Sequence, residues 1–188
     1  MSKITPELSS LKSLLSEDEF SLLVKYKARK KYVTGLESTN IVGLSHSVSE
    51  GYFAMLKLSL SFSAVEMLCT VISRKGNLGI RHQRFTEALN EGLFDKLLQG
   101  IDNDSKRRYP RTSHTELESW KSLPADADLT KFIYQCRNYM FHGSFTPSEA
   151  GLTSVRLRSL LLELSLATLD AGEDALLTWT RKQLRNRG

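Results

Sequence analysis

The chain of 188 residues is long enough for one globular domain, and its 40% hydrophobic and 25% charged residues are ordinary for a soluble protein. The net charge of +5 favours a polyanionic partner, although net charge alone does not establish one. Cys69 and Cys136 lie in apolar patterns outside any CxxC or paired Cys/His motif, so we expect buried, reduced thiols and no zinc site. The sequence has no secretory leader and no Gly-rich phosphate loop, so we expect a cytoplasmic protein without a cofactor.

The first predicted helix begins after Ser16, because Ser16 and Glu19 fit a capping box in which each side chain bonds the other residue's backbone amide. Apolar residues follow at helical spacing and lead into a basic run made of Lys25, Lys27, Arg29, Lys30 and Lys31. Two interpretations of this run stay open. The cations can be the solvated end of a helix, where they suit the negative end of its dipole, or they can form a phosphate-binding patch.

A second capping box, Ser47 with Glu50, predicts a helix over about residues 48–74. Part of this helix is apolar enough to raise the question of a membrane span. It carries Lys57 and Glu66, however, and charged residues at a bilayer centre cost about 2.5–3.5 kcal/mol each. We therefore expect a buried core helix and no association with a membrane.

A third helix is predicted over about residues 82–99, although Gly92 disfavours its middle. Residues 101–127 follow as a long polar loop with room for a short helix around residues 115–121, and loops of this length in small domains usually serve function or mobility. Five residues of this loop could grip a phosphate backbone and stack a base: Lys106, Arg107, Arg108, Tyr109 and Arg111. A solvated loop without such a role is the alternative.

Two further helices complete an all-α prediction that contains no strands. One covers about residues 128–141. The other begins at a third capping box, Thr146 with Glu149, and continues to the basic end of the chain. Gly172 is expected to bend or break this last helix.

The chemically informative segment is residues 134–143, at the end of the fourth predicted helix. Asn138 and His142 are four residues apart, so they lie within about 40° of each other on one helix face, and the long Arg137 side chain can reach that face. Gly143 stands where a C-cap is expected, and the helix dipole there favours a protonated imidazole. The segment thus combines an imidazole able to titrate near neutrality with a guanidinium able to clamp a phosphate.

These groups are the ones needed to cleave RNA without a metal ion. A base takes the proton of the 2′-hydroxyl, the oxygen attacks the adjacent phosphate, and a cation stabilises the charge that develops. The reaction profits from an acid as well as a base, whereas one copy of the motif supplies one histidine. Two copies that face each other across a symmetric dimer would supply both, so we expect a homodimer with a composite site.

The pattern Arg137-x4-His142, with Asn138 after the arginine and Gly143 after the histidine, resembles the R-x(4–6)-H motif of HEPN domains. These are helical domains common in toxin–antitoxin, CRISPR and other defence systems. The run of residues 62–68 is similar to the first core helix of many HEPN proteins, in which a polar or acidic residue points at the motif.

The resemblance covers residues 46 to about 180. It implies a HEPN-like up-and-down helical bundle over residues 46–188, with residues 1–45 as an N-terminal helical extension.

The resemblance also implies a metal-independent endoribonuclease that leaves a 2′,3′-cyclic phosphate. Arg137 and His142 would be catalytic, Asn138 a supporting polar group and Glu66 a residue that orients the motif. Arg137 is also a candidate structural partner of Glu66, because a bare carboxylate is costly to bury. Ser144 stands where some HEPN toxins carry a tyrosine that a partner nucleotidyltransferase modifies with AMP, so regulation of that kind is not expected.

We therefore expect a toxin or anti-phage defence nuclease that acts on RNA as a homodimer, with an antitoxin or defence-system protein as a further partner. Two alternatives stay open. One is a non-catalytic HEPN-type module that dimerises or binds RNA or nucleotide. The other is a helical adaptor that docks a partner through an exposed apolar face.

Overall fold

Every regular element in the described part of the chain is a helix. The structure is a computed structural model that describes residues 11–37, 41–72, 78–108, 118–124, 127–141 and 146–186, without the side chains of residues 103–108, 140 and 141. The helices are η1 (Lys12–Leu14), α2 (Glu17–Gly35), α3 (His46–Val71), α4 (Gln83–Asn90), α5 (Asp95–Arg108), α7 (Thr130–Phe141) and α8 (Val155–Arg185). The predicted all-α class is confirmed for these residues.

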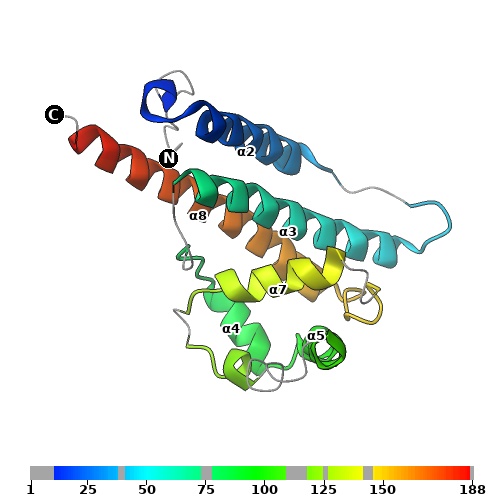
Figure 1. The fold of residues 1–188 in the computed structure, drawn as a ribbon. Helices are drawn as coiled ribbons and strands as arrows, with labels where there is room; N and C mark the ends of the chain where they lie inside the picture. The colour runs from blue at the N-terminus through cyan, green and yellow to red at the C-terminus, as the bar shows by residue number, and fades with distance from the viewer. Residues whose placement is uncertain are drawn as a thin grey trace.

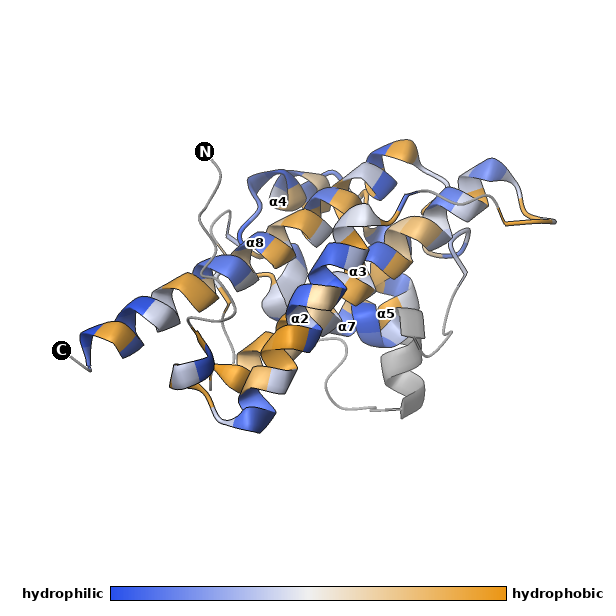
Figure 2. Ribbon diagram, turned by 90° about the horizontal axis from the view of Figure 1, so that it is seen from above, coloured by the Kyte–Doolittle hydropathy of each residue, from blue (hydrophilic) through white to orange (hydrophobic). Residues whose placement is uncertain are grey.

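Helix α3 is the centre of the fold, since it packs against α2, α7 and α8. In Figure 1 it runs between α2 and α7, antiparallel to α2 and in the same direction as α8. Its buried residues, from Ser49 to Val71, lie on nearly every side of the helix, as expected for a helix covered by its neighbours. On α8 the buried residues recur at three- and four-residue steps and exposed residues lie between them, so one side of this helix faces water. Figure 2 shows hydrophilic and hydrophobic residues alternating along it.

The length and composition of α3 are also those of a membrane-crossing helix. In the structure, 56% of its most apolar window is buried inside the protein. Both of its charged side chains named above have partners in the protein: Lys57 Nζ donates to the carbonyl of Leu36 at 3.1 Å, and Glu66 pairs with Arg137. The core helix of a soluble protein has the same properties, so a single helix of this kind is weak support for a membrane span.

Of the first two predicted capping boxes, one is confirmed and the other is wrong. The Ser16 box is confirmed: the hydroxyl of Ser16 accepts from the amide of Glu19 at 3.3 Å, and the Glu19 carboxylate accepts from the amide of Ser16 at 2.9 Å. The predicted box at Ser47 is wrong. The N-cap of α3 is Ser45, which has the extended backbone that a cap needs and accepts from the amide of Val48 at 3.4 Å.

The predicted helix over residues 82–99 is in fact two helices. Gly92 has a φ of 71°, in the left-handed region that favours glycine, and this turn separates α4 from α5. Helix α5 then extends through residue 108, so the prediction of a loop from residue 101 onward is wrong for these residues. Polar composition alone does not end a helix, and the sequence has no glycine or proline between residue 101 and Pro110. Residues 118–121 form a further helical turn.

The third capping box forms, but it does not start the last helix. The amide of Thr146 donates to Glu149 Oε2 at 2.7 Å, and the amide of Glu149 donates to Thr146 Oγ1 at 3.4 Å. Hydrogen bonds from Thr146 hold the pKa of Glu149 below its ordinary value. The chain then turns through residues 147–153, and α8 begins after Ser154, whose hydroxyl accepts from the amide of Leu157. The predicted helix start was therefore too early in the sequence.

Gly172 does not break α8, because the helix is continuous from Val155 to Arg185. A Cβ atom at position 172 would lie 2.9 Å from Val65 Cγ2 and 3.4 Å from Tyr26 Oη. The absence of a side chain therefore allows α8 to approach α2 and α3 closely.

Helix α2 shares a hydrophobic core with the rest of the chain. Three of its side chains are buried in the same cluster as residues of α3 and α8: Leu23, Tyr26 and Val33. The division into an extension of residues 1–45 and a domain of residues 46–188 stays a prediction.

Candidate functional site

An aromatic cluster fixes α7, the helix that carries the motif. The ring of Phe132 lies 4.6 Å from that of Phe85 and 5.4 Å from that of Trp120, measured between centroids. Leu129, just before α7, and two residues of the helix itself, Ile133 and Cys136, are buried at helical spacing on this side. Because this face is held in the core, the rotation of α7 is set, and Tyr134 and Arg137 are brought to its contact with α3.

Arg137 joins α7 to α3 through an ion pair with Glu66. Its Nη2 atom donates to Glu66 Oε2, and its Nη1 atom donates to Asn138 Oδ1 at 2.7 Å. The guanidinium also lies over the ring of Tyr134, with 5.7 Å between its Cζ atom and the ring centroid. Three of the four residues predicted as catalytic are thus together: Arg137, Asn138 and Glu66.

The ion pair is partly open to water. The side chain of Arg137 is 25% exposed and that of Glu66 is 35% exposed. Pairs this accessible usually contribute about 1 kcal/mol or less to stability, because water screens the attraction. The contacts of Arg137 matter more for its orientation than for stability, because two polar partners and the ring of Tyr134 set the plane of the guanidinium. An incoming phosphate would compete with Glu66 and Asn138 for its donors, and a guanidinium can offer phosphate two parallel bonds.

Tyr134 is a residue of the site to which the sequence assigned no role. The residue is 40% exposed, and the centroid of its ring lies 5.9 Å from that of Phe62 on α3. The signal was present, because Tyr134 precedes Arg137 by three residues and so shares its side of the helix. An exposed ring beside a guanidinium can stack a nucleobase.

His142, the fourth predicted catalytic residue, lies outside the described residues. Helix α7 ends at Phe141, so His142 is the next residue along the chain. Arg137 and Asn138 therefore belong to the C-terminal part of α7, near the negative end of its dipole. The catalytic role of His142 therefore stays a prediction.

The predicted RNA-binding residues can be placed only in part. The backbone of residues 106–108 belongs to α5, which packs against α7, but the side chains of Lys106, Arg107 and Arg108 are not among those described. Tyr109 and Arg111 lie outside the described residues. Contact of these five residues with RNA stays a prediction.

Within the described ranges, no three His, Cys, Asp or Glu side chains are grouped so that they could hold a metal ion. Comparison of the chain with models of protein families, with curated proteins and with solved structures finds no match.

Proposed function

We propose that this chain is a HEPN-type endoribonuclease of the toxin or anti-phage defence class, acting in the cytoplasm as a homodimer. The observation that carries the proposal is the junction of α3 and α7, where Glu66 and Asn138 hold the guanidinium of Arg137. An arginine near the end of a helix, beside an acidic residue of the first core helix, is the arrangement that the HEPN resemblance implies. A HEPN-like up-and-down bundle is the finer form of the all-α fold that we propose.

The proposed reaction is a transphosphorylation that needs no metal ion. His142 of one protomer removes the proton of the 2′-hydroxyl, and the 2′-oxygen attacks the adjacent phosphorus. The bond between phosphorus and the 5′-oxygen breaks, and the partner subunit's His142 gives a proton to that oxygen. The products are a 2′,3′-cyclic phosphate and a 5′-hydroxyl. Arg137 stabilises the negative charge that develops on the non-bridging oxygens.

Glu66 and Asn138 are positioning residues in this proposal, because they act through Arg137. They hold its guanidinium in one orientation before RNA arrives, so less freedom is lost on binding. The partly exposed position of the pair lets a phosphate displace Glu66 from some of the donors without first opening the core.

Two further parts of the proposal concern contacts away from the motif. Five residues would hold the RNA backbone and stack a base: Lys106, Arg107, Arg108, Tyr109 and Arg111. An antitoxin or another defence-system protein would control the nuclease, as the resemblance to toxin–antitoxin and defence proteins implies.

The second candidate is a non-catalytic HEPN-type module that dimerises or binds RNA or nucleotide. The same ion pair favours it, because a structural arginine that neutralises Glu66 would make the same contacts. The two candidates differ in one respect. Only the nuclease needs both Arg137 and His142 for a chemical step.

Cleavage of a structured RNA by the purified chain in EDTA tests the proposal. We expect products with 2′,3′-cyclic ends, and we expect Arg137→Ala and His142→Ala to abolish them. Arg84→Ala and His46→Ala are the matched controls, since both residues are exposed and lie outside the motif, and they should cleave like the wild type. RNA binding without cleavage by a folded, dimeric wild type freed of any co-purified protein would favour the non-catalytic module.

A further inference from the structure

The basic run of α2 does not lie at the end of its helix. Helix α2 continues to Gly35, and its last turn contains no basic residue. The favourable interaction with the helix dipole is confined to the last turn, so it does not explain cations at positions 25–31. The run is therefore not the end of the helix, although two of its cations, Lys25 and Lys31, are solvated.

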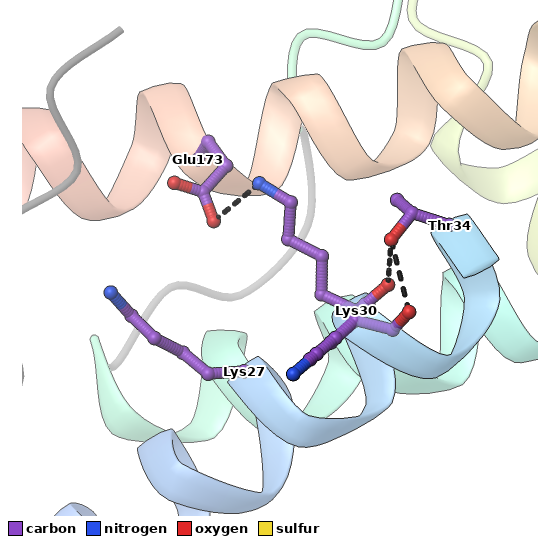
Figure 3. Close-up of a pocket in the computed structure, with 5 residues that line it drawn as sticks. Lys27, Lys30, Thr34 and Glu173 are labelled. Atoms are coloured by element: carbon purple, nitrogen blue, oxygen red, sulfur yellow. Dashed lines mark hydrogen bonds and ion pairs between the residues drawn. The ribbon is translucent and has the colours of Figure 1, made fainter.

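The structure divides the run among three surroundings. Lys25 is exposed, and Arg29 Nη1 donates to the hydroxyl of Ser63 on α3 at 2.8 Å. The other three cations line a cavity of about 280 Å³ between α2 and α8, together with Thr34 and Glu173: Lys27, Lys30 and Lys31. In Figure 3 the side chains of Lys27 and Lys30 extend from the side of α2 that faces Glu173 on α8. Helical spacing explains the set, because positions 27, 30, 31 and 34 recur on one face.

The single carboxylate of the cavity already has two partners. Glu173 is 5% exposed, and its Oε1 atom accepts from the hydroxyl of Tyr26 at 2.9 Å and pairs with Lys30 Nζ at 2.8 Å. These contacts satisfy a carboxylate that would be costly to bury alone. The cavity therefore has three ammonium groups against one carboxylate, and the excess charge is positive.

Lys27 is partly buried at this cavity, whereas Lys31 and Thr34 are exposed to water. Burial is the main cause that lowers the pKa of Lys27; the carboxylate of Glu173 acts against this effect and the charge of Lys30 acts with it. A lysine in such surroundings gains when an anion arrives, because the anion replaces lost solvation. A volume of about 280 Å³ is near the lower end for ligand sites and suits a small group.

We propose that the cavity between α2 and α8 binds a phosphate group through Lys27 and Lys31, with the hydroxyl of Thr34 as an uncharged donor. The hydroxyl of Thr34 now bonds the carbonyls of Lys30 and Lys31, each at 3.0 Å, and can turn to a ligand. Lys30 stays paired with Glu173. The site shares no residue with the Arg137–Glu66 pair and stands independently of the nuclease proposal.

Two sources of phosphate fit this chemistry, and binding measurements on the full chain distinguish them. Titration calorimetry at fixed ionic strength would use adenosine diphosphate, inorganic phosphate and a ten-residue oligodeoxynucleotide, which has phosphodiesters but cannot undergo 2′-hydroxyl cleavage. Saturable binding of the first two identifies a free phosphate compound. Binding of the oligonucleotide alone identifies a nucleic-acid backbone. Both results support a phosphate site.

The variants decide whether the cavity is responsible. Loss of one charge-assisted hydrogen bond should weaken binding by about tenfold in Lys31→Gln and in Lys27→Gln. Lys25→Gln is the matched control, because it removes one exposed lysine of the same helix outside the cavity. Its affinity should stay within about twofold of the wild type. Absence of saturable binding with every probe, or an equal loss in Lys25→Gln and Lys31→Gln, would overturn the proposal.

Discussion

Two ion pairs each join one helix to another, and they differ in how exposed they are to water. The pair between Arg137 and Glu66 joins α7 to α3, and its carboxylate side chain is 35% exposed. The pair between Lys30 and Glu173 joins α2 to α8, and its carboxylate side chain is only 7% exposed. Tyr26 gives the buried carboxylate a second donor, whereas no such buried hydroxyl is described at Glu66.

The difference in burial separates a pair that the fold needs from a pair that a ligand can rearrange. A buried carboxylate must keep its partners, since an unpaired buried charge is strongly destabilising. A partly exposed pair can exchange one partner for water or phosphate at little cost to folding. Substitutions at Glu173 should therefore affect the free energy of unfolding, and substitutions at Glu66 should affect function.

The largest expected effect on stability is that of Glu173→Ala. The substitution leaves the hydroxyl of Tyr26 buried without its acceptor and Lys30 without its carboxylate. We expect a loss of about 2–3 kcal/mol, below the usual cost of breaking a buried pair because Lys30 can turn to water. Urea denaturation measures it. A loss under about 0.5 kcal/mol would contradict the comparison, since it would mean that Glu173 is not needed for folding.

The tight contact of α8 with α2 and α3 beside Glu173 can be tested with Gly172→Ala. The new Cβ atom would meet Val65 Cγ2 at 2.9 Å, so we expect a loss of about 1–2 kcal/mol. Gly35→Ala is the control, because Gly35 lies in a helical last turn with no atom within 4 Å of the added carbon. It should leave stability unchanged or raise it by up to about 1 kcal/mol. Equal effects of the two variants would show that α8 does not approach closely.

A third carboxylate, Glu19, extends the comparison to a group held by hydrogen bonds alone. Ser16→Ala should cost about 1 kcal/mol, because it removes the cap of α2. Hydrogen bonds from Ser16 lower the pKa of Glu19. The Glu19 carboxylate therefore contributes to the stability of the fold at neutral pH, and this contribution is lost as the pH falls through its lowered pKa.

The pH dependence has its own control in Glu19→Gln, which keeps the capping geometry without the titration. The wild type should be more stable than this variant at neutral pH by a few tenths of a kcal/mol, and the difference should be smaller at an acidic pH. Urea midpoints at the two pH values measure it. A difference that grows on acidification would contradict the sign of the shift.

Glu66→Gln should also have only a small effect on stability, at about 0.5 kcal/mol or less. If Glu66 positions Arg137, the same variant should lower the RNA cleavage rate by about tenfold or more while KM changes little. Glu66→Asp, which keeps the charge, should recover part of that rate. A large loss of stability with no specific loss of rate would assign Glu66 to folding alone.

The sequence predicted features that depend on near neighbours and missed those decided by packing. The Ser16 box was correct, because all its bonds lie within four residues. Ser45 and Ser47 can both cap a helix, and the structure uses Ser45 although only Ser47 is followed three residues later by a glutamate. The pairing of Glu66 with Arg137 was foreseeable, because a carboxylate in an apolar helix needs a cation.

The cavity between α2 and α8 was not foreseeable in the same way. Tyr26 and Glu173 lie 147 positions apart, and no local pattern relates them. The basic run was visible, but its division among Ser63, Glu173 and the cavity depends on the packing of three helices. Gly172 was misread for the same reason, since the close approach that requires it is a tertiary contact.

The central claim is that the motif around Arg137 cleaves RNA by attack of the 2′-oxygen. The most direct measurement uses an oligoribonucleotide that the wild type cleaves in EDTA, and the same oligonucleotide with one 2′-deoxy nucleotide on the 5′ side of the cut. We predict that the substitution abolishes cleavage at that bond while neighbouring sites react as before. Cleavage of the substituted bond at the original rate would contradict the claim, because no 2′-oxygen would then be needed.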